Sequence, residues 1–433
     1  MRLKTTGGLK EGEQISTTSG DAVKIIELLG EGGQGEVYKV LYKGKEKALK
    51  WYTDLGKNPD AFRQNLKDNI EKGSPNACYL WPQALTEWRY GSFGYIMELL
   101  PKGYYEMSKF MIGNVHFNSW KTAVDAALNM VMAFRLLHNK GRSYQDLNPG
   151  NFFIQPNTGE VLIGDNDNIA PTGENMGILG KPRYIAPEIV RGENLPDTAS
   201  DRYSLAVLLF IMFCYGHPLE GKTGTPFVMT PENSMVIYGT HPVFVFDPKD
   251  DSNRPIPGVH NTVLTLWNCL PSYMQDIFRK AFSQESLMKK RRVIEYDWLK
   301  ALARFRSDIR PCPYCGNEVF LESGEDTPCD VCGKLVKVKN RIAFSEYRIP
   351  AEPGSRIYRI QLGTVDFEKA LDPVAVILAN PQNRNDVRIR NLSDERWNAT
   401  TLSGKSKQLQ HKEMAPVKAG ISFVAYGEKF EIQ

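Results

Sequence analysis

The chain has 433 residues, which is long for one domain and predicts two or three. Its 42% apolar and 24% charged residues are typical of globular proteins and exclude a disordered or fibrous chain. A net charge of +4 gives no indication of nucleic acid or membrane partners, so we expect neither. The start of the chain lacks the apolar core of a signal peptide, and the longest apolar run, Leu205 to Tyr215, is about half a membrane span. We therefore expect a cytoplasmic protein.

A glycine-rich turn follows a polar beginning. Residues 1–20 are rich in Gly, Thr and Ser and predict a flexible or loosely docked lead-in. Val23 to Leu29 and Glu36 to Tyr42 are predicted strands, and the turn between them is one that many hairpins contain. Lys50 follows two apolar residues in the next strand, and this context fits a hairpin lid over nucleotide phosphates with Lys50 reaching the α- and β-phosphates. An exposed strand lysine is the alternative. The residues of this nucleotide lid are Gly30, Gly32, Gly33, Gly35 and Val37.

Two helices and a strand are predicted next. Pro59 to Lys72 is a predicted helix, and Phe93 to Pro101 contains a predicted strand. Ser119 to Lys140 has apolar residues at helical spacing, which predicts a long buried helix. The loop after this helix carries Asp146 and, five residues later, Asn151. A carboxylate there can orient and deprotonate an attacking hydroxyl, and the Asn oxygen can hold Mg²⁺, so the pair suits phosphoryl transfer.

The order of these motifs resembles one family. The features that carry the resemblance are the glycine turn, Lys50, Asp146 with Asn151, Asp165, Ala186-Pro187-Glu188, Asp201 and Arg292. Together they resemble the protein kinases, specifically the eukaryotic-like Ser/Thr kinases found in bacteria, over about residues 21–306. The resemblance implies an α+β, bilobal kinase fold for this part of the chain.

The resemblance also implies roles for individual residues. Asp165 becomes a second Mg²⁺ ligand beside Asn151. Met97 takes the gatekeeper position, and the backbone from Glu98 to Leu100 meets the adenine edge of ATP. Two further features are structural: Asp201 holds the backbone of the catalytic loop, and Arg292 pairs with Glu188, which needs a cationic partner if it is buried.

The helix that normally supplies an acid to Lys50 departs from the family pattern. Asn65 occupies the position of the acid, so Asp68, one turn later on the same face, is the predicted partner, with Glu71 as the fallback. Asp167 follows Asp165 at a spacing of two, and it is either a further metal ligand or a turn residue.

The catalytic loop also departs from the pattern. Gln145 stands where Arg is usual and carries no charge to pair with a phosphorylated activation loop, so switching by phosphorylation is not expected. Asn148 stands where Lys is usual, which removes a positive charge near the transferred phosphoryl group. Lys181, in the position of a family Thr, is the predicted replacement for that charge.

Four cysteines near residue 320 form a metal-binding pattern. Cys312 with Cys315 and Cys329 with Cys332 make two C-x-x-C-G turns, separated by thirteen residues. Four thiolates predict a closed, structural zinc site rather than a catalytic one. Disulfides, a rubredoxin-like iron site and unpaired thiols are the alternatives. The predicted zinc ribbon spans residues 307–340.

The rest of the chain, residues 341–433, alternates short apolar segments with turn residues, which predicts a β-sandwich. The expected strands are Arg356 to Leu362, Val374 to Ala379, Val387 to Ile389, Ile421 to Ala425 and Lys429 to Ile432. The segments 387–393 and 420–430 resemble the tail half of forkhead-associated domains. The phosphothreonine-binding Arg and Ser of that family have no counterpart here, so we expect a degenerate, partner-binding sandwich.

These observations predict an ATP- and Mg²⁺-dependent Ser/Thr protein kinase that acts on a protein hydroxyl. A pseudokinase scaffold is one alternative, supported by the residues at 65, 148 and 166–167. A small-molecule phosphotransferase is another, which the Ala186-Pro187-Glu188 segment with Arg292 opposes. Kinases with a fused zinc ribbon resemble members of tellurite-resistance-associated systems, which implies von Willebrand A and metal-dependent phosphatase partners.

Overall fold

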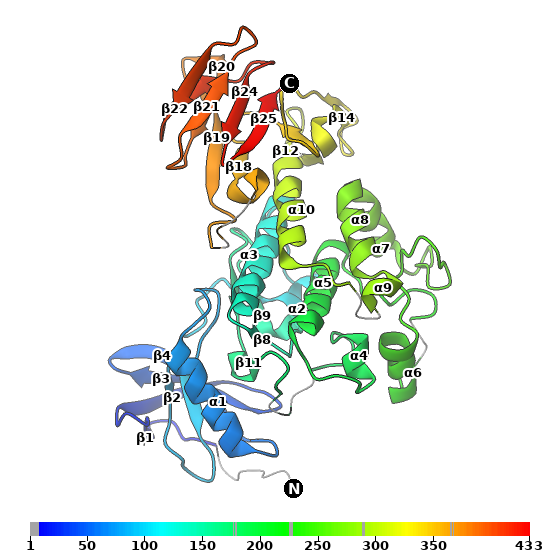
Figure 1. The fold of residues 1–433 in the computed structure, drawn as a ribbon. Coiled ribbons are helices and arrows are strands. Elements are labelled where there is room, and N and C mark those ends of the chain that lie inside the picture. The colour runs from blue at the N-terminus through cyan, green and yellow to red at the C-terminus, as the bar shows by residue number, and fades with distance from the viewer. Residues whose placement is uncertain are drawn as a thin grey trace. The chain divides into compact units, whose positions relative to one another are not determined.

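A computed structural model of the chain describes residues 8–175, 177, 180–224, 228–287, 291–363, 366 and 368–433 (Figure 1). The chain forms two compact units. Unit 1 draws on Met1–His116, Ala133–Leu264 and Arg279–Val293, and unit 2 on Phe117–Met132, Thr265–Phe278 and Ile294–Gln433. The boundary falls within helices α3 (Trp120–Asn139), α7 (Asn261–Cys269) and α8 (Ser272–Ala281), so each of these helices contributes to both units.

Unit 1 begins with a six-stranded antiparallel sheet in the order β1-β2-β3-β4-β6-β5. Its strands are β1 (Gln14–Ser16), β2 (Ala22–Glu31), β3 (Gly35–Tyr42), β4 (Lys45–Tyr52), β5 (Ala84–Leu85) and β6 (Gly94–Met97). Alternation along β4 divides its side chains between the two faces. Leu49 and Trp51 enter the core of one face, whereas Ala48 and Tyr52 enter the core of the other. The strands predicted at residues 23–29 and 36–42 are therefore confirmed.

Of the two possibilities for the lead-in, residues 8–20 are docked on the sheet and not flexible. Strand β1 pairs with β2 in register Ile15 with Val23, and Leu9 and Ile15 are buried in the core of the sheet. Two apolar side chains and a ladder of backbone hydrogen bonds are enough to order this polar segment. Residues 1–7 of the predicted lead-in lie outside the described residues.

Helix α1 (Pro59–Lys72) has the predicted bounds. The side chain of Asn58 accepts a hydrogen bond from the Ala61 amide at 3.2 Å, and Pro59 occupies the first helical position, where its missing N–H costs nothing. Gly73, with φ 73°, ends the helix.

The remaining elements of unit 1 are mainly helical. They are β7 (Tyr105–Glu106), α2 (Met107–Met111), β8 (Arg142–Ser143), η1 (Pro149–Asn151), β9 (Phe152–Ile154), β10 (Val161–Ile163), η2 (Asn166–Asn168), β11 (Ala170–Pro171), α4 (Pro187–Val190), α5 (Thr198–Cys214), α6 (Pro231–Met235), the π-helical turn η3 (Val236–Thr240) and α9 (Gln284–Leu287). The apolar run that begins at Leu205 belongs to α5, which ends at Cys214 and starts at Thr198, where Asp197 and Ser200 form a capping box. Among the described residues, no helix combines the length and apolarity that a bilayer span requires.

The predicted pair between Glu188 and Arg292 is confirmed. Both carboxylate oxygens of Glu188 lie 2.8 Å from Nη2 of Arg292, and the two side chains are 3% and 5% exposed. The guanidinium also lies over the ring of Tyr203, 5.2 Å from its centroid. Glu188 opens α4 and Tyr203 belongs to α5, so this buried pair connects three segments of unit 1.

Unit 2 contains helix α10 (Glu295–Asp308) and two small hairpins. The hairpins are formed by β12 (Ile309–Pro311) with β13 (Glu318–Phe320) and by β14 (Thr327–Pro328) with β15 (Leu335–Val336); the turn η4 (Glu322–Gly324) lies between them in sequence. The carboxylate of Glu318 accepts hydrogen bonds from the amides of Trp120 and Lys121 at the start of α3. A negative side chain at this position satisfies amides that the helix itself leaves unpaired.

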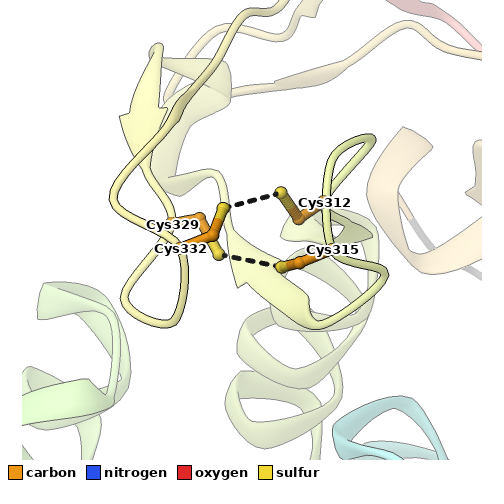
Figure 2. Close-up of side chains that lie close together, drawn as sticks. All are labelled: Cys312, Cys315, Cys329 and Cys332. Carbon is orange, nitrogen blue, oxygen red and sulfur yellow. Dashed lines mark hydrogen bonds between the residues drawn. The ribbon is translucent and has the colours of Figure 1, made fainter.

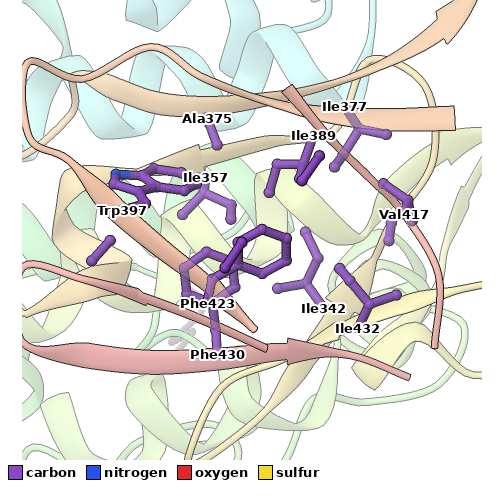
Figure 3. Packing of buried hydrophobic residues seen from close by; sticks show 14 of the residues in the cluster. Ile342, Ile357, Ala375, Ile377, Ile389, Trp397, Val417, Phe423, Phe430 and Ile432 are labelled. Atoms are coloured by element: carbon purple, nitrogen blue, oxygen red, sulfur yellow. The ribbon is translucent and has the colours of Figure 1, made fainter. Parts of the chain in front are cut away.

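Two antiparallel sheets follow and share one apolar core (Figure 3). The six-stranded sheet contains β17 (Arg348–Pro350), β16 (Arg341–Ala343), β25 (Glu428–Ile432), β24 (Ser422–Ala425), β21 (Trp397–Thr400) and β22 (Ser406–Leu409) in that order. The four-stranded sheet contains β18 (Arg356–Tyr358), β19 (Pro373–Asn380), β20 (Asn383–Asn391) and β23 (Met414–Pro416). Phe423 and Phe430 form a cross-strand pair, stacked at 5.1 Å.

Most of the predicted strands in this region are confirmed, but one is shorter than expected. Residues 359–362 form the 3₁₀ turn η5 (Arg359–Leu362) instead of continuing β18. The side chain of Gln361 accepts a hydrogen bond from the Tyr358 amide at 2.8 Å and caps this turn. Ile360, Gln361 and Leu362 are buried in succession, which breaks the in-and-out alternation of a half-buried strand.

A buried polar network connects the two sheets of unit 2. Asn391, at the end of β20, donates to the carbonyls of Glu395 and Leu409 at 2.8 and 3.1 Å. Its side-chain oxygen accepts hydrogen bonds from the amide and hydroxyl of Ser393, and that hydroxyl accepts from Trp397 Nε1 at 3.1 Å. Asn391 and Ser393 therefore satisfy each other's polar groups inside the fold.

We expect loss of the buried carboxylate to destabilise the fold strongly. Glu188→Ala leaves the Arg292 guanidinium buried without its counter-charge, which should lower the free energy of unfolding by about 3–5 kcal/mol. Chemical denaturation measures this change. Glu193→Ala removes the partner of Arg191 at the surface and should have a much smaller effect. Equal effects of the two substitutions would contradict the assignment.

Candidate active site

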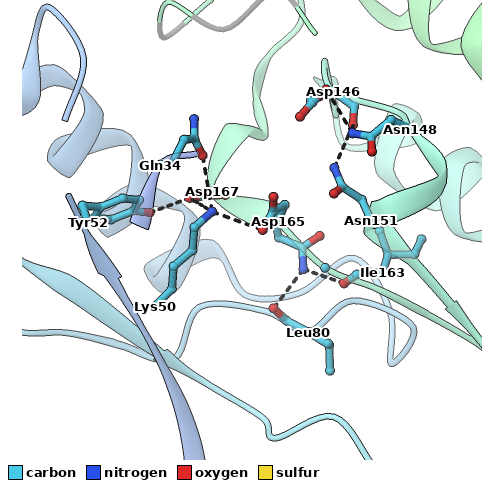
Figure 4. A network of polar contacts seen from close by, with 12 residues as sticks. Gln34, Lys50, Tyr52, Leu80, Asp146, Asn148, Asn151, Ile163, Asp165 and Asp167 are labelled. Carbon is cyan, nitrogen blue, oxygen red and sulfur yellow. Dashed lines mark hydrogen bonds and ion pairs between the residues drawn. The ribbon is translucent and has the colours of Figure 1, made fainter. Parts of the chain in front are cut away.

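Lys50 lies at the centre of a polar network in unit 1 (Figure 4). Its ammonium Nζ donates to Oδ2 of Asp167 at 2.8 Å and to Oδ1 of Asp165 at 3.1 Å. Gln34, from the glycine turn, lies 3.4 Å away through Oε1. The phenolic hydroxyl of Tyr52 donates to the same Asp167 oxygen at 2.6 Å. Lys50 therefore links β4, the glycine turn and the segment after β10.

The charges in this network are strongly coupled. The side chain of Lys50 is 6% exposed, and that of Asp167 is fully buried. Burial alone would lower the pKa of the Lys50 ammonium, but the carboxylates of Asp167 and Asp165 outweigh burial and hold that pKa above its ordinary value. Burial, followed by the charge of Asp167, raises the pKa of the Tyr52 hydroxyl well above its usual range, so Tyr52 remains a hydrogen-bond donor.

The predicted ion pair between Lys50 and Asp68 is not formed. Asp68 instead accepts a hydrogen bond from Gln64 at 2.7 Å, one turn earlier on the exposed side of α1, and the fallback Glu71 is exposed. Asn65, at the family position, is buried and donates to the carbonyl of Ile169 at 2.9 Å. Amides rather than acids occupy the buried side of α1, where Asn65 and Asn69 lie.

Asp201 holds the backbone of the catalytic loop, as predicted. Its carboxylate accepts hydrogen bonds from the amides of Tyr144 at 2.6 Å and Gln145 at 3.1 Å, and it lies 3.0 Å from Nε2 of His138. The hydroxyl of Tyr144 donates to the carbonyl of Gly164, immediately before Asp165. The loop and the Asp165 segment are therefore connected through buried hydrogen bonds.

Asp146 and Asn151 lie together on this loop. Asn151 Nδ2 donates to the Asp146 carbonyl at 2.9 Å, and the Asn151 carbonyl accepts from the Gly164 amide at 2.8 Å. Burial, with a further contribution from the charge of Asp165, raises the pKa of the Asp146 carboxyl to about 6. Asn148 opposes this shift by donating to Oδ1 of Asp146 at 3.2 Å. Lys50, Asp165, Asn151 and Asp146 thus belong to one connected group.

Asp165 has a backbone conformation that few non-glycine residues adopt. Its φ of 47° and ψ of 46° place it in the left-handed region, which costs on the order of 1–3 kcal/mol and is common at functional sites. Its side chain is 43% exposed, in contrast to that of Asp167. Asn166 holds this turn through hydrogen bonds of 2.8 Å to the carbonyls of Leu80 and Ile163.

Lys181 lies beside the catalytic loop. Its Nζ is 3.4 Å from Oδ1 of Asn148, and its charge lowers the pKa of Asp146 against the effect of burial. Lys181 therefore lies close to Asn148, which stands where the family usually has a lysine. The predicted role of Lys181 was to supply the positive charge of that lysine.

The residues of the predicted nucleotide lid and hinge differ in burial. Gly30, Gly32 and Gly33 are exposed, whereas Gly35 is buried so closely against β4 that a Cβ atom would lie 2.1 Å from the Trp51 carbonyl. Val37, Met97 and Leu100 share one apolar cluster. Glu98, next to Met97, is exposed and binds Lys47 and Gln83 through its carboxylate.

Gln145 binds the segment that follows β11. Its Nε2 donates to the Glu174 carbonyl at 2.6 Å, and its Oε1 accepts from Asn175 Nδ2 at 2.8 Å. These are hydrogen bonds between uncharged groups, where the family usually has an arginine.

Unit 2 carries the cysteine cluster (Figure 2). The four Sγ atoms of Cys312, Cys315, Cys329 and Cys332 lie within 4.8 Å of one another, and all four thiols are free. Cys312 to Cys332 and Cys315 to Cys329 are 3.7 and 3.6 Å apart. A tetrahedron of thiolates around zinc has edges of about 3.8 Å, whereas sulfurs in a disulfide lie about 2.05 Å apart.

The two cysteine turns have the same backbone hydrogen bonds. The Cys312 amide donates to the Asn317 carbonyl and the Cys329 amide to the Lys334 carbonyl, at 2.7 and 2.9 Å. The amides of Gly316 and Gly333 donate back to the carbonyls of these cysteines, and both glycines have positive φ angles. This repeated turn aims all four sulfurs at one point.

Three residues of the Lys50 network were not predicted as its partners. Tyr52 lies two residues after Lys50 on β4, so strand alternation alone places both side chains on one face and could have indicated it. Gln34 is a polar residue within the glycine turn. Asp167 was noted, but no local pattern connects it to Lys50, because the two are 117 positions apart.

Comparisons with known proteins agree with this geometry. The family profile "Protein kinase domain" matches residues 23–256, more than half of the 433 residues. The chain is 28% identical over 208 residues to a probable cAMP-dependent protein kinase catalytic subunit of Encephalitozoon cuniculi, covering 45% of this chain and 61% of that protein. It is 23% identical over 342 residues to the protein kinase YegI of Escherichia coli, covering 74% of this chain and 50% of that protein.

A third relative is the serine/threonine-protein kinase mos of Patiria pectinifera, 25% identical over 217 residues, covering 46% of this chain and 59% of that protein. The chain thus spans about half to three fifths of the lengths of these relatives. The family match covers the glycine turn, Lys50, the catalytic loop and Asp165. The chain therefore belongs to the protein kinase family.

Proposed function

We propose that the chain is an ATP- and Mg²⁺-dependent Ser/Thr protein kinase whose kinase domain spans about residues 21–306. The observation that carries this proposal is the connected network of Lys50, Asp165, Asn151 and Asp146. These residues come from three segments, β4, the catalytic loop and the turn after β10, which the Lys50–Asp165 ion pair and hydrogen bonds to backbone groups join. Their charges and ligand types match those required for phosphoryl transfer.

Each residue of the network has a role in this proposal. Asp146 accepts the proton of the substrate hydroxyl and orients it, while Lys50 contacts the α- and β-phosphates. Asn151 and Asp165 offer oxygen ligands to Mg²⁺, and the exposure of Asp165 leaves it accessible to the metal. Bound Mg²⁺ neutralises charge on the phosphates. The glycine turn covers the nucleotide, whose adenine meets the backbone from Glu98 to Leu100 next to Met97.

Lys181 supplies the positive charge that Asn148 lacks. The 3.4 Å approach of Lys181 Nζ to Asn148 supports this role, because a charge placed there acts on Asp146 and on the phosphoryl group beside it.

A pocket beside Lys181 supports a protein substrate over a small molecule. It has a volume of about 450 Å³ and is lined mainly by apolar atoms of Pro182, Tyr184, Met229 and Tyr238. An apolar side chain near the acceptor hydroxyl of a peptide fits such a pocket. The Glu188–Arg292 pair, expected in peptide-binding kinases, supports the same conclusion.

A pseudokinase scaffold is the second candidate. Asn65 in place of the usual acid favours it, because the anchor of Lys50 on α1 is missing. The pairing of Lys50 with Asp165 and Asp167 opposes it, because Lys50 remains held in the site by other acids.

We further propose that residues 307–340 form a structural zinc ribbon and residues 341–433 a β-sandwich. The spacing of the four sulfurs supports zinc over disulfides, and four free thiols fit a reducing compartment such as the cytoplasm. The shared core of the two sheets supports the sandwich. We also propose that the sandwich resembles forkhead-associated domains. The proposed partners of the chain are those of tellurite-resistance-type kinases, a von Willebrand A protein and a metal-dependent phosphatase.

Transfer of phosphate should require Asp146. We expect Asp146→Asn to lower kcat by about 10²–10⁴-fold with little change in nucleotide affinity, because the variant keeps the shape of the side chain but cannot accept a proton. Incubation with labelled ATP, Mg²⁺ and a general protein substrate measures the rate. Asp250→Asn, on the surface of unit 1, is the control. Absence of transfer by the unaltered protein, with retained nucleotide binding, would favour the pseudokinase.

The charge of Lys181 should contribute to the rate. Lys181→Ala should reduce kcat at least tenfold, because a positive charge near the transferred group stabilises the transition state. Lys181→Arg keeps the charge and should retain most activity, and Lys222→Ala, an exposed lysine, should have no effect. Near-normal turnover of Lys181→Ala would end this assignment.

The cysteine cluster should bind one zinc ion per chain. Native mass spectrometry and metal analysis should find one zinc in the purified protein, and Cys315→Ser should lose most of it, since three thiolates bind zinc more weakly than four. Cys269→Ser, outside the cluster, should keep the metal. Iron in the protein would support the rubredoxin-like alternative. A metal-free protein lighter by four hydrogen atoms, as two disulfides require, would support the disulfide alternative.

A further inference from the structure

We propose that Asp167 is the positioning residue that holds Lys50 against the nucleotide phosphates, in place of an acid on helix α1. This inference rests on the proposed phosphotransfer function and adds a residue to its machinery. Asp167 acts through Lys50 and does not itself contact the nucleotide.

The contacts of Asp167 assign it to Lys50. One carboxylate oxygen, Oδ2, accepts from Lys50 Nζ at 2.8 Å and from the Tyr52 hydroxyl at 2.6 Å (Figure 4). The other oxygen, Oδ1, is buried and has no hydrogen-bond partner among the described residues. A buried carboxylate needs a counter-charge, and Lys50 is the cation that lies against it. Tyr52, on the same strand as Lys50, fixes the orientation of the carboxylate.

Exposure separates the roles of the two acids. The side chain of Asp165 is 43% exposed, and that of Asp167 is 0% exposed. A Mg²⁺ ion that also contacts phosphates and water can reach Asp165, whereas the carboxylate of Asp167 is closed to it. When Asp165 binds metal, it is no longer free to hold Lys50. Asp167 then remains as the acid that keeps the ammonium pointing into the site.

Helix α1 is attached to the same segment, but without charge. Asn65 and Asn69 both donate to the carbonyl of Ile169, at 2.9 and 2.8 Å. Ile169 lies two residues after Asp167. The helix therefore supports the turn that carries Asp167, and its own acids, Asp68 and Glu71, take no part in holding Lys50.

Nucleotide binding tests this assignment without relying on turnover. The full chain is titrated with a non-hydrolysable ATP analogue in the presence of Mg²⁺. Asp167→Asn should weaken binding at least tenfold and raise the KM for ATP more than it lowers kcat, because Lys50 loses its orientation. Asp68→Asn and Glu71→Gln are matched controls on α1 and should bind within twofold of the unaltered protein. Unchanged affinity in Asp167→Asn, or a comparable loss in Asp68→Asn, would overturn the proposal.

A double-mutant cycle separates positioning from a general structural role. In a Lys50→Met background, Asp167→Asn should weaken nucleotide binding no further, since the residue through which it acts is gone. An equal loss in both backgrounds would show that Asp167 acts independently of Lys50 and would refute the assignment. Tyr52→Phe, which keeps both charges, should give a smaller loss of affinity and provides a test if Asp167→Asn folds poorly.

The same cycle can be read without any nucleotide. Asp167→Asn should lower the midpoint of thermal unfolding by more in the unaltered protein than in the Lys50→Met background, because the charge pair exists only in the former. Equal shifts would contradict the pairing. This measurement reports on Asp167 even if the unaltered protein transfers no phosphate, so failure of the proposed kinase activity and failure of this assignment can be told apart.

Discussion

A buried ammonium group must have an acid beside it, and much of unit 1 is arranged around this requirement at Lys50. Strand β4 carries Lys50 into a region with almost no access to water, where burial opposes its charge. Asp165 and Asp167 outweigh that cost. The segment that carries both aspartates is itself held by hydrogen bonds from Asn166 and from the side-chain amides of α1. Lys50 thus connects the sheet to the glycine turn and to the Asp165 segment.

The departures from the family pattern are related to one another. Asn65 in place of an acid is compatible with a held lysine because Asp167 lies against the ammonium, and the Tyr52 hydroxyl donates a further hydrogen bond to this aspartate. Asn148 likewise has a cation, Lys181, beside it. Each substitution, considered singly, suggests loss of function. When the neighbouring residues are included, each substitution is matched by a nearby residue with the charge that was lost.

Local patterns in the sequence predicted local structure well. Helix α1 was predicted residue for residue because Asn58, Pro59 and Gly73 mark its ends, and the cysteine turns were identified from spacing alone. The ion-pair partner of Lys50 was mispredicted because helical periodicity shows only which residues of α1 share a face. It does not show which side chain contacts Lys50 on β4. Asp167 lies 117 positions from Lys50, a distance that no periodicity spans. The order in residues 8–20 was left open for a related reason, since it comes from pairing with β2 rather than from composition.

The hydrogen bonds of Gln145 have a consequence for how the protein is controlled. An arginine at this position can pair with a phosphorylated activation loop. Phosphorylation then activates the catalytic loop, and a phosphatase reverses the change. Gln145 already binds the following segment through uncharged amide groups, at Glu174 and Asn175. Such contacts are complete as soon as the chain has folded and are little affected by ionic strength. The catalytic loop and the segment after β11 are therefore joined through neutral amide groups that need neither a phosphate nor a counter-charge.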